Sequence, residues 1–469
     1  MQKSSICAAV CSALLCFALY GCAKNDVSAA APQDVKSAAD TQNTTAELPG
    51  TKSNAGTVAF AAGSVPADAG EIRMILADGE TARLASLPNL ASADFSGSRN
   101  EEEIAAWAKA HPEVECYYTV TLPNRDVLDS GARSYDLSGM TPAECETAAA
   151  KLALLPALRT VRLGAEGGAW TWEALAAFKK LLPDTTFRYA FTLYGKACDL
   201  SDASLNFRHV PVGDAGEELR RVIPLMTELS YVDMDSSGVS NQDMEKLRAD
   251  FPDVKFVWRV WFGENYSVRT DVQRILASKP SAGGMLYEWD TEALACCHDV
   301  VFLDLGHNKQ LKDISFVRQM PKLEVAILGM CDWSDASPLT SCPELEYLEM
   351  FSTQCTDLRP LAQLKNLRHL NIAGIPNLED ISPLYSMTQL ERLWLGSMNR
   401  VPWEQCEEFQ KRVPNCEVDT GVYDDPTGGH WRYDGNGDIV DRYFLLRMQF
   451  GYYESEVYSY TWNDKLYDP

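Results

Sequence analysis

Apolar residues recur at steps one, four and six of a short motif in the C-terminal third of the chain. The motif occurs five times: Val300, Leu303, Leu305; Leu323, Ala326, Leu328; Leu345, Leu348, Met350; Leu367, Leu370, Ile372; and Leu390, Leu393, Leu395. Because alternate residues of a strand point to opposite sides, each motif predicts a short strand with one buried face. Four related phrases follow the first four motifs, LKDISFV, WSDASPL, CTDLRPL and LEDISPL. Their aspartates, Asp313, Asp335, Asp357 and Asp380, lie 22, 22 and 23 residues apart, which predicts a coil that repeats once per period.

The same apolar triad recurs upstream at wider spacing. It is found at Leu90, Ala93, Phe95; at Leu158, Val161, Leu163; and at Leu229, Val232, Met234, so that the starting positions 90, 158, 229 and 300 are 68, 71 and 71 residues apart. A second element keeps this rhythm: a helical run, then Pro112, Pro183 or Pro252, then alternating apolar residues. We therefore predict degenerate, helix-bearing repeats over 58–299, in a supra-repeat of about 70 residues equal to three coils. A separate α/β domain over 66–290 is the alternative.

The LxxLxL motif and the D[IL]SPL phrase together resemble internalin-type leucine-rich repeats over 300–397. This resemblance implies an α/β solenoid: a right-handed coil with short parallel strands on the concave face and tight return segments between them. Residues 398–469 are then expected to form a C-terminal cap, with a helix before Pro414, and an aromatic tail. A cap is needed because the last coil would otherwise leave its core open to water.

The N-terminus predicts the compartment. Lys3 precedes an apolar run from Ile6 to Leu19, followed by Tyr20, Gly21 and Cys22, which resembles the signal of a bacterial lipoprotein. The resemblance implies a signal peptide over 1–21, lipid on the Cys22 thiol and a place in the bacterial cell envelope, outside the cytoplasm. An ordinary secretory signal or a short membrane anchor are the alternatives. Residues 22–57 contain almost no large apolar side chains and are expected to be a flexible tether.

Outward-pointing strand positions supply the candidate ligand-binding surface. Steps three, five and seven of each coil point away from the core and should form ladders on the concave face. The candidates are Phe302, Asp304, Val325, Ile327, Tyr347, Glu349, Phe351, His369, Asn371, Arg392 and Trp394. Large apolar residues on an exposed face usually mark an interaction site, and aromatics with arginine are frequent anchors. As an alternative, the aromatic segment 421–469 folds back and covers some of these residues.

Signatures of catalysis are absent from the sequence. It contains no HExxH, GxSxG, P-loop or paired CxxC motif. The formal net charge of −24 disfavours a nucleic-acid partner, because binding to phosphate backbones relies on lysine and arginine. Asp434, Asn436 and Asp438 have the spacing of a calcium loop, but Ile439 replaces the required glycine, so a polar turn is the preferred interpretation. No cofactor is expected.

Ten cysteines follow Cys22, and repeat columns account for several of them. Cys342 falls in an apolar column, Cys331 stands where leucine-rich repeats allow Asn or Cys, and Cys355 occupies the next inward site. Most of these thiols are therefore expected to be free and buried. The pairing of Cys296, Cys297, Cys406 and Cys416 stays open.

The sequence thus predicts a non-catalytic, membrane-anchored binding protein that holds a protein or glycan on the concave face of a solenoid. The membrane would be reached through the lipid anchor only. A structural or assembly lipoprotein of the cell envelope, without an external ligand, is the alternative function.

Overall fold

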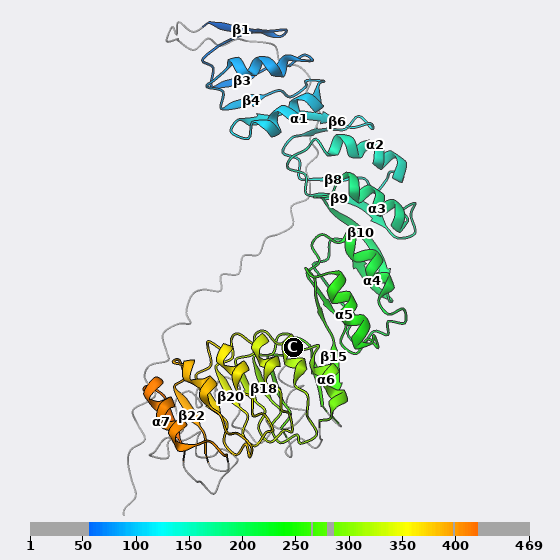
Figure 1. Cartoon of the computed structure of the whole chain (residues 1–469). Helices are drawn as coiled ribbons and strands as arrows, with labels where there is room; N and C mark the ends of the chain where they lie inside the picture. Colours follow the sequence, from blue (N-terminus) through cyan, green and yellow to red (C-terminus); the bar gives the residue numbers. More distant parts are fainter. Residues whose placement is uncertain (1–55, 264–265, 279–285, 397–398, 421–469) are drawn as a thin grey trace, which may run out of the picture. The chain divides into compact units, whose positions relative to one another are not determined.

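The computed structural model describes residues 56–263, 266–278, 286–396 and 399–420 (Figure 1). The predicted signal peptide, the lipidation site Cys22, the tether, the calcium candidates Asp434, Asn436 and Asp438, and the aromatic tail lie outside these residues. A search of the described part found no helix of the length and apolarity that crossing a bilayer requires.

The N-terminal half consists of three blocks that repeat the same order of elements. Each block has three parallel strands, two helical return segments and an antiparallel hairpin. A hairpin of β1 (Thr57–Phe60) and β2 (Gly63–Pro66) precedes them. Block 1 contains β3 (Glu71–Arg73), η1 (Glu80–Ser86), β4 (Ser92–Asp94), α1 (Glu101–Ala110), β5 (Glu115–Tyr117), β6 (Thr119–Thr121) and β7 (Val127–Asp129).

Blocks 2 and 3 follow the same plan. Block 2 contains β8 (Ser134–Asp136), α2 (Pro142–Leu152), β9 (Thr160–Ala165), α3 (Trp172–Leu181), β10 (Thr186–Leu193) and β11 (Lys196–Asp199). Block 3 contains β12 (Ser204–Asn206), α4 (Glu217–Val222), η2 (Ile223–Leu225), β13 (Tyr231–Asp233), α5 (Asn241–Asp250), β14 (Lys255–Val257), β15 (Arg259–Phe262) and β16 (Tyr266–Arg269). The parallel ladder stops at each hairpin, so each block has its own sheet.

Proline ends the same helix in every block, as the sequence predicts. α1, α3 and α5 end two residues before Pro112, Pro183 and Pro252, because the residue before proline is driven out of the helical region. At the start of two of these helices a side chain accepts a hydrogen bond from a free backbone N–H group. Thr171 caps α3 and Ser240 caps α5 in this way.

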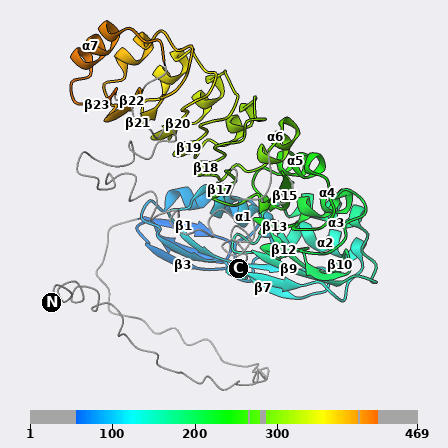
Figure 2. The same cartoon turned by 90° about the horizontal axis from the view of Figure 1, so that it is seen from below.

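The C-terminal half is one sheet of seven parallel strands in sequence order (Figures 1 and 2). The strands are β17 (Arg274–Leu276), β18 (Phe302–Asp304), β19 (Val325–Ile327), β20 (Tyr347–Glu349), β21 (His369–Asn371), β22 (Arg392–Trp394) and β23 (Glu417–Asp419). The return segments are η3 (Glu288–Asp290) with α6 (Thr291–Leu294), then η4 (Ser315–Gln319), η5 (Ser337–Ser341), η6 (Arg359–Gln363), η7 (Ser382–Ser386) and α7 (Trp403–Arg412). The ladder therefore extends one strand beyond the regular repeats at each end.

The repeated aspartates set the geometry of the return segments. Asp313, Asp335, Asp357 and Asp380 each accept a hydrogen bond from the backbone N–H two residues further on, at 2.7–3.0 Å. This turn places the chain at the start of η4, η5, η6 and η7. Proline follows within the first turn of three of them, where its missing N–H costs nothing. The recurring phrase is thus a local signal for a tight 3₁₀ return.

A single apolar core runs through all blocks and the seven-stranded sheet, from Phe60 to Cys416. Every residue of the predicted inward triads is at most 9 % exposed, including the three upstream triads. Pairing aligns the central residues of β18 to β22 in one column, Leu303, Ala326, Leu348, Leu370 and Leu393. A fully buried leucine contributes about 1.5–3 kcal/mol to stability, so each inward column stabilises the coil substantially.

Cysteines take part in this core as small apolar residues. All ten cysteines of the described part are free, and only Cys116 and Cys406 are partly exposed. The thiols of Cys331 and Cys342 donate to the carbonyls of Leu305 and Val317 in the preceding coil. Burial raises the pKa of both thiols to about 12, which keeps them protonated and unreactive.

Candidate binding face

Strand register aligns the predicted ligand-binding residues in two columns. One column runs Arg274, Phe302, Val325, Tyr347, His369 and Arg392, and the other runs Leu276, Asp304, Ile327, Glu349, Asn371 and Trp394. Neighbouring strands are ~4.8 Å apart, so successive side chains of a column touch. We call these columns, with Phe351 and Ala373 beside them, the outward face of the seven-stranded sheet. The alignment is as the sequence predicts.

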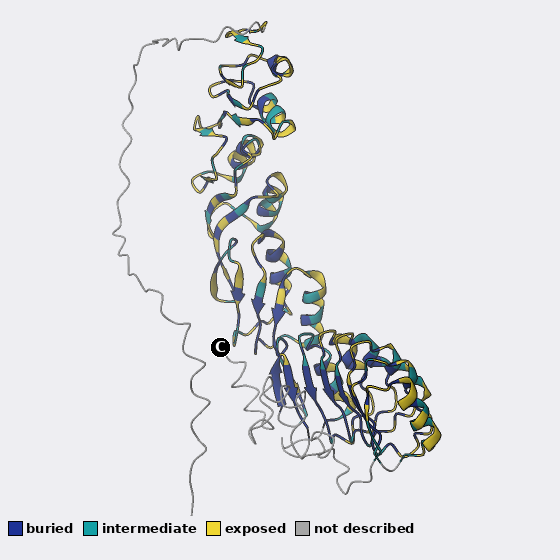
Figure 3. Ribbon diagram, turned by 90° about the vertical axis from the view of Figure 1, so that its left-hand side faces the viewer, coloured by how far each residue is buried: buried dark blue, intermediate teal, exposed yellow. Residues whose placement is uncertain are grey.

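The exposure predicted for this face is wrong. All eleven candidate residues are buried, with exposed fractions between 0 and 6 %. Figure 3 shows the strands of this sheet in the colour of buried residues. A strand residue that points away from the coil interior meets water only where nothing packs on that side of the sheet. Here these residues form a second apolar cluster, distinct from the main core: Leu276, Phe302, Val325, Ile327, Tyr347, Phe351, Ala373 and Trp394. The binding role assigned to them stays a prediction.

Contacts within the face are specific. The Tyr347 hydroxyl donates to Glu349 Oε1 at 2.7 Å, and the Tyr347 ring stacks on His369 with centroids 5.8 Å apart. Phe351 lies across Gly329, where any Cβ would collide with its ring. Glycine at that position therefore makes room for an aromatic residue from the next coil. Gly396 gives similar room to Ala373, whose Cβ would be 2.7 Å from an added Cβ.

The outward positions of blocks 1 and 2 have the opposite character. In block 2, register places Asp136, Arg162 and Arg188 side by side, and all three are exposed. In block 1 the aligned residues are Arg73, Asp94 and Tyr117, of which only Asp94 is partly buried. These residues were not among the candidates predicted from the sequence. A signal was present for two of them, because Asp94 and Arg162 stand at step five of the upstream triads, as Asp304 and Glu349 do downstream.

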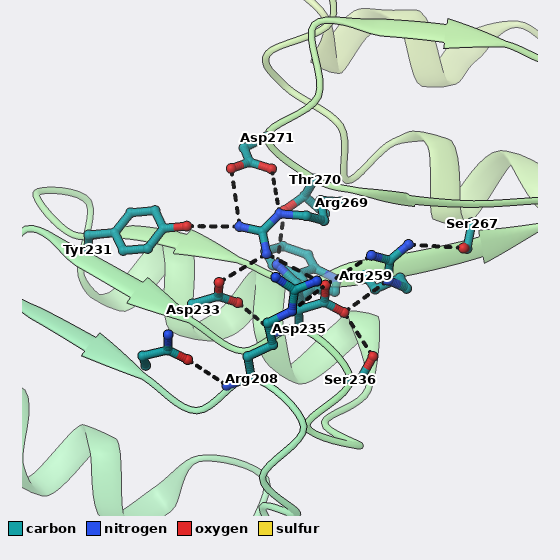
Figure 4. A network of polar contacts seen from close by, with 12 residues as sticks. Arg208, Tyr231, Asp233, Asp235, Ser236, Arg259, Ser267, Arg269, Thr270 and Asp271 are labelled. Atoms are coloured by element: carbon teal, nitrogen blue, oxygen red, sulfur yellow. Dashed lines mark hydrogen bonds and ion pairs between the residues drawn. The ribbon is translucent and has the colours of Figure 1, made fainter. Parts of the chain in front are cut away.

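Block 3 carries a charge network on its outward side (Figure 4). Asp235 receives two parallel hydrogen bonds from Arg259, at 3.0 and 3.1 Å, and a third from the Ser236 hydroxyl. Arg269 donates to Asp233 at 2.9 Å and pairs with Asp271. Arg259 and Arg269 come from the hairpin β15–β16, whereas Asp233 is the last residue of the parallel strand β13 and Asp235 lies two residues beyond it. The network therefore ties the hairpin to the sheet.

Hydrogen bonding decides the charge state of this network. Burial works against ionisation of Asp235, but hydrogen bonds from Arg259 and Ser236 and the charge of Arg269 together hold its pKa below the ordinary value. Burial likewise disfavours the Arg269 cation, yet hydrogen bonds with Asp271 and Asp233 raise its pKa. The Asp235 carboxylate and the Arg269 guanidinium are thus both charged at neutral pH.

Two clefts lie outside the outward face. One, of about 610 Å³, is lined mostly by apolar residues between α1, the end of α2 and the end of α3, among them Leu155 and Leu182. The other, of about 580 Å³, lies between α5 and α6 and contains Cys296 and His298. There Arg248 donates to the carbonyl of Cys296 and stacks on Trp258. Burial raises the pKa of Cys296 to about 12, which is unsuited to a nucleophile. No group of metal-binding side chains was found in the described part of the chain.

Comparison with known proteins supports the repeat assignment. The family "Leucine Rich repeats (2 copies)" matches residues 343–386, the stretch from just before β20 to the end of η7. The mouse protein "Cilia- and flagella-associated protein 410" is 37 % identical over 87 residues, which is 18 % of this chain and 35 % of that protein. The chain thus spans about a third of that relative.

Three solved structures of leucine-rich repeat proteins are similar at low identity. An internalin, inlF of Listeria monocytogenes, is 16 % identical, with 75 % of this chain and 67 % of that one covered and a TM-score of 0.26. An internalin C2 of Listeria monocytogenes is 15 % identical, covering 60 % and 84 %, with a TM-score of 0.24. A Leptospira interrogans leucine-rich repeat protein is 15 % identical, covering 74 % and 92 %, with a TM-score of 0.29. The solenoid assignment rests on the repeat match and the parallel register, and it establishes a leucine-rich repeat fold.

Proposed function

We propose that this chain is a non-catalytic binding protein, held outside the cytoplasm by lipid on Cys22, which binds a protein or glycan on the strand side of its solenoid. Leucine-rich repeat solenoids generally serve as protein-binding scaffolds, because their repeats build an extended surface. The observation that carries the proposal is the pair of outward columns. Phe302, Tyr347 and Trp394 stand there in an unbroken ladder over five coils that also contains the charged residues Asp304, Glu349 and Arg392. Aromatic anchors with charged neighbours are the usual composition of a binding hot spot.

Binding is tested with the mature chain, residues 22–469, immobilised and exposed in parallel to an envelope extract and to a glycan array. The test variant is Tyr347→Ala with Trp394→Ala, and the matched control is Trp261→Ala with Trp289→Ala, which removes two exposed aromatics elsewhere. Thermal unfolding of each variant shows whether it is folded. We expect the same ligand on wild type and control and its loss from the test variant. Equal recovery from both variants would contradict the assignment to the outward face.

Anchoring is tested separately. In cells fed a labelled fatty acid, the wild-type chain should take up label and sediment with membranes, because two acyl chains bind a bilayer stably. The variant Cys22→Ser should do neither. Label on the Cys22→Ser chain would show that the lipid is attached to another residue.

The burial of the outward face favours a second candidate, a structural or assembly lipoprotein without an external ligand. A surface whose aromatic residues are at most a few per cent exposed offers little area to a ligand in this conformation. In that case neither the envelope extract nor the glycan array yields a ligand that depends on Tyr347 and Trp394. The wild-type chain and both variants then give the same result.

A further inference from the structure

A layer of side chains must cover the outward face of the seven-stranded sheet. Side chains at alternate strand positions project to the same side of the sheet. Neighbours in a column therefore cover the sides of each side chain but leave its tip exposed to solvent. Block 2 shows this situation, since Arg162 and Arg188 are exposed in the corresponding column. In the seven-stranded sheet, Tyr347, Phe351 and Trp394 are at most 2 % exposed. Burial of that degree requires atoms stacked on the face.

The described residues do not supply that layer. Every buried member of the second apolar cluster belongs to the sheet or to the residues directly after its strands. Val301 and Met330, which pack against the cluster, also adjoin strands of this sheet. Within 56–263, 266–278, 286–396 and 399–420, no apolar residue of a second layer belongs to the cluster. The cover must come from the rest of the chain or from another molecule.

Length and composition single out one segment. The internal stretches 264–265, 279–285 and 397–398 are too short to cross seven strands, which span ~29 Å at ~4.8 Å per step. Residues 1–55 contain two aromatic residues, Phe17 and Tyr20. Residues 421–469 contain eight Tyr, two Trp and two Phe, twelve aromatics in 49 residues, against 10 % in the whole chain. A cover for aromatic side chains needs apolar surface of this kind.

Chain continuity and charge point to the same segment. It begins two residues after Asp419, the last residue of β23, at one edge of the sheet to be covered. At ~3.3 Å per extended residue, 49 residues could cross the sheet more than once. Nine Asp and Glu and four Arg and Lys in the segment offer partners to both signs of buried charge on the face, which includes Asp304, Glu349 and Arg392.

We infer that residues 421–469 of this chain dock on the outward face of the seven-stranded sheet and form its second layer. The inference goes beyond the proposed function and does not depend on it, because it concerns what covers the face in the absence of a ligand. The docked segment also protects a face that would otherwise be a large apolar patch open to association.

Side-chain oxidation by hydroxyl radicals, located by mass spectrometry, tests the docking without a ligand. The test variant is the full mature chain with Trp431, Tyr443, Phe444 and Phe450 all changed to Ser. The matched control changes exposed Trp261 and Trp403 to Ser. Three tryptophans are the readout: Trp394 on the outward face, Trp333 in the main core and exposed Trp289. We expect oxidation of Trp394 to rise about tenfold, toward that of Trp289, while Trp333 stays protected. Unchanged protection of Trp394 would overturn the inference.

A second measurement does not depend on the folding of that variant. A photoreactive benzoyl-phenylalanine replaces Phe351 in the otherwise unchanged chain, and a mixture of ¹⁵N-labelled and unlabelled protein is irradiated. Cross-links to residues 421–469 of the same isotopic chain support the inference. Cross-links to 1–55, to the described residues alone, or between light and heavy chains would overturn it, the last by showing that a second copy is the cover. Because neither measurement needs a ligand, failure of the inference is distinguishable from failure of the proposed function.

Discussion

The strands of block 2 and of the seven-stranded sheet have the same inward pattern, but their outward residues differ in burial. In both, the inward residues are apolar and fully buried, as Val161 and Leu348 show. On the outward side Arg162 is exposed, whereas Glu349, at the corresponding step, is 0 % exposed. The inward pattern therefore reports the coil alone. The burial of the outward residues depends on what packs on that side of the sheet. The inward and outward patterns of a solenoid must therefore be interpreted separately.

Sheet continuity accompanies this difference. Each N-terminal block breaks its ladder with a hairpin, so its outward columns contain only three parallel strands. In block 3 the hairpin itself supplies the groups that cover part of the face, through Arg259 and Arg269. From β17 onward the ladder is uninterrupted, and its columns become long enough to hold a contiguous apolar cluster. The uninterrupted ladder thus distinguishes the seven-stranded sheet, whose outward face is buried, from blocks 1 and 2, whose outward columns are mostly exposed.

The largest expected effect is on the outward face. Tyr347→Ala should lower the free energy of unfolding by about 3–5 kcal/mol, because the residue is buried and its removal leaves a cavity. Arg162→Ala, on the exposed outward side of block 2, should change it by no more than about 0.5 kcal/mol. Urea unfolding of the full chain measures both. Similar effects of the two substitutions would remove the contrast between the regions.

The next effect concerns the charge network of block 3. Asp235→Ala should cost about 3–5 kcal/mol, because it leaves Arg259 and Arg269 buried without this carboxylate. Its control, Arg188→Ala, breaks the more exposed pair with Asp199 in block 2 and should cost about 0.2–1 kcal/mol. Hydrogen exchange of β15 and β16 locates the damage. If the hairpin keeps its protection in Asp235→Ala, the network does not tie it to the sheet.

Removing one repeated aspartate should have a moderate effect. Asp335→Ala abolishes the hydrogen bond to the N–H of Ser337 at the start of η5 and should cost about 1 kcal/mol. Asp332→Ala, three residues earlier and exposed, is the matched control and should be nearly neutral. Thermal unfolding compares the two variants. Equal destabilisation would mean that the turn, rather than the carboxylate, starts the return segment.

The smallest effect is pH-dependent and belongs to block 1. Glu103 accepts hydrogen bonds from Thr81, Asn100 and the Gly79 N–H, which lower its pKa from 4.5 to about 2. A carboxyl with a lowered folded-state pKa stabilises the fold above its unfolded pKa, and this stability is lost as pH falls from about 4.5 to about 2. The difference in unfolding temperature between wild type and Glu103→Gln should therefore be largest near neutral pH and shrink over that window. A difference that is independent of pH would contradict the role of the charge.

Sequence periodicity by itself determined the repeating part of the fold. The inward triads, the prolines after α1, α3 and α5, and the aspartates of the return segments act within one coil, so local pattern specifies them. Cys331 and Cys342 are found in the core for the same reason. The ends of the ladder were not determined in this way. β17 has an apolar triad, Val272, Ile275 and Ala277, that lies outside the regular period, and β23 lacks the full triad; pairing with β18 and β22 brings the two strands into the sheet.

Only the tertiary structure decided the state of the outward face. The alternation that aligns Phe302, Tyr347 and Trp394 is the same whether they face water or a second layer, because strand geometry sets the side of a residue and not its neighbours. Burial depends on contacts between segments distant in sequence, which no periodicity encodes. The hairpin of block 3 shows the same limit, since the arginines of β15–β16 reach Asp233 and Asp235, at and just after the end of β13, only when the chain has folded back.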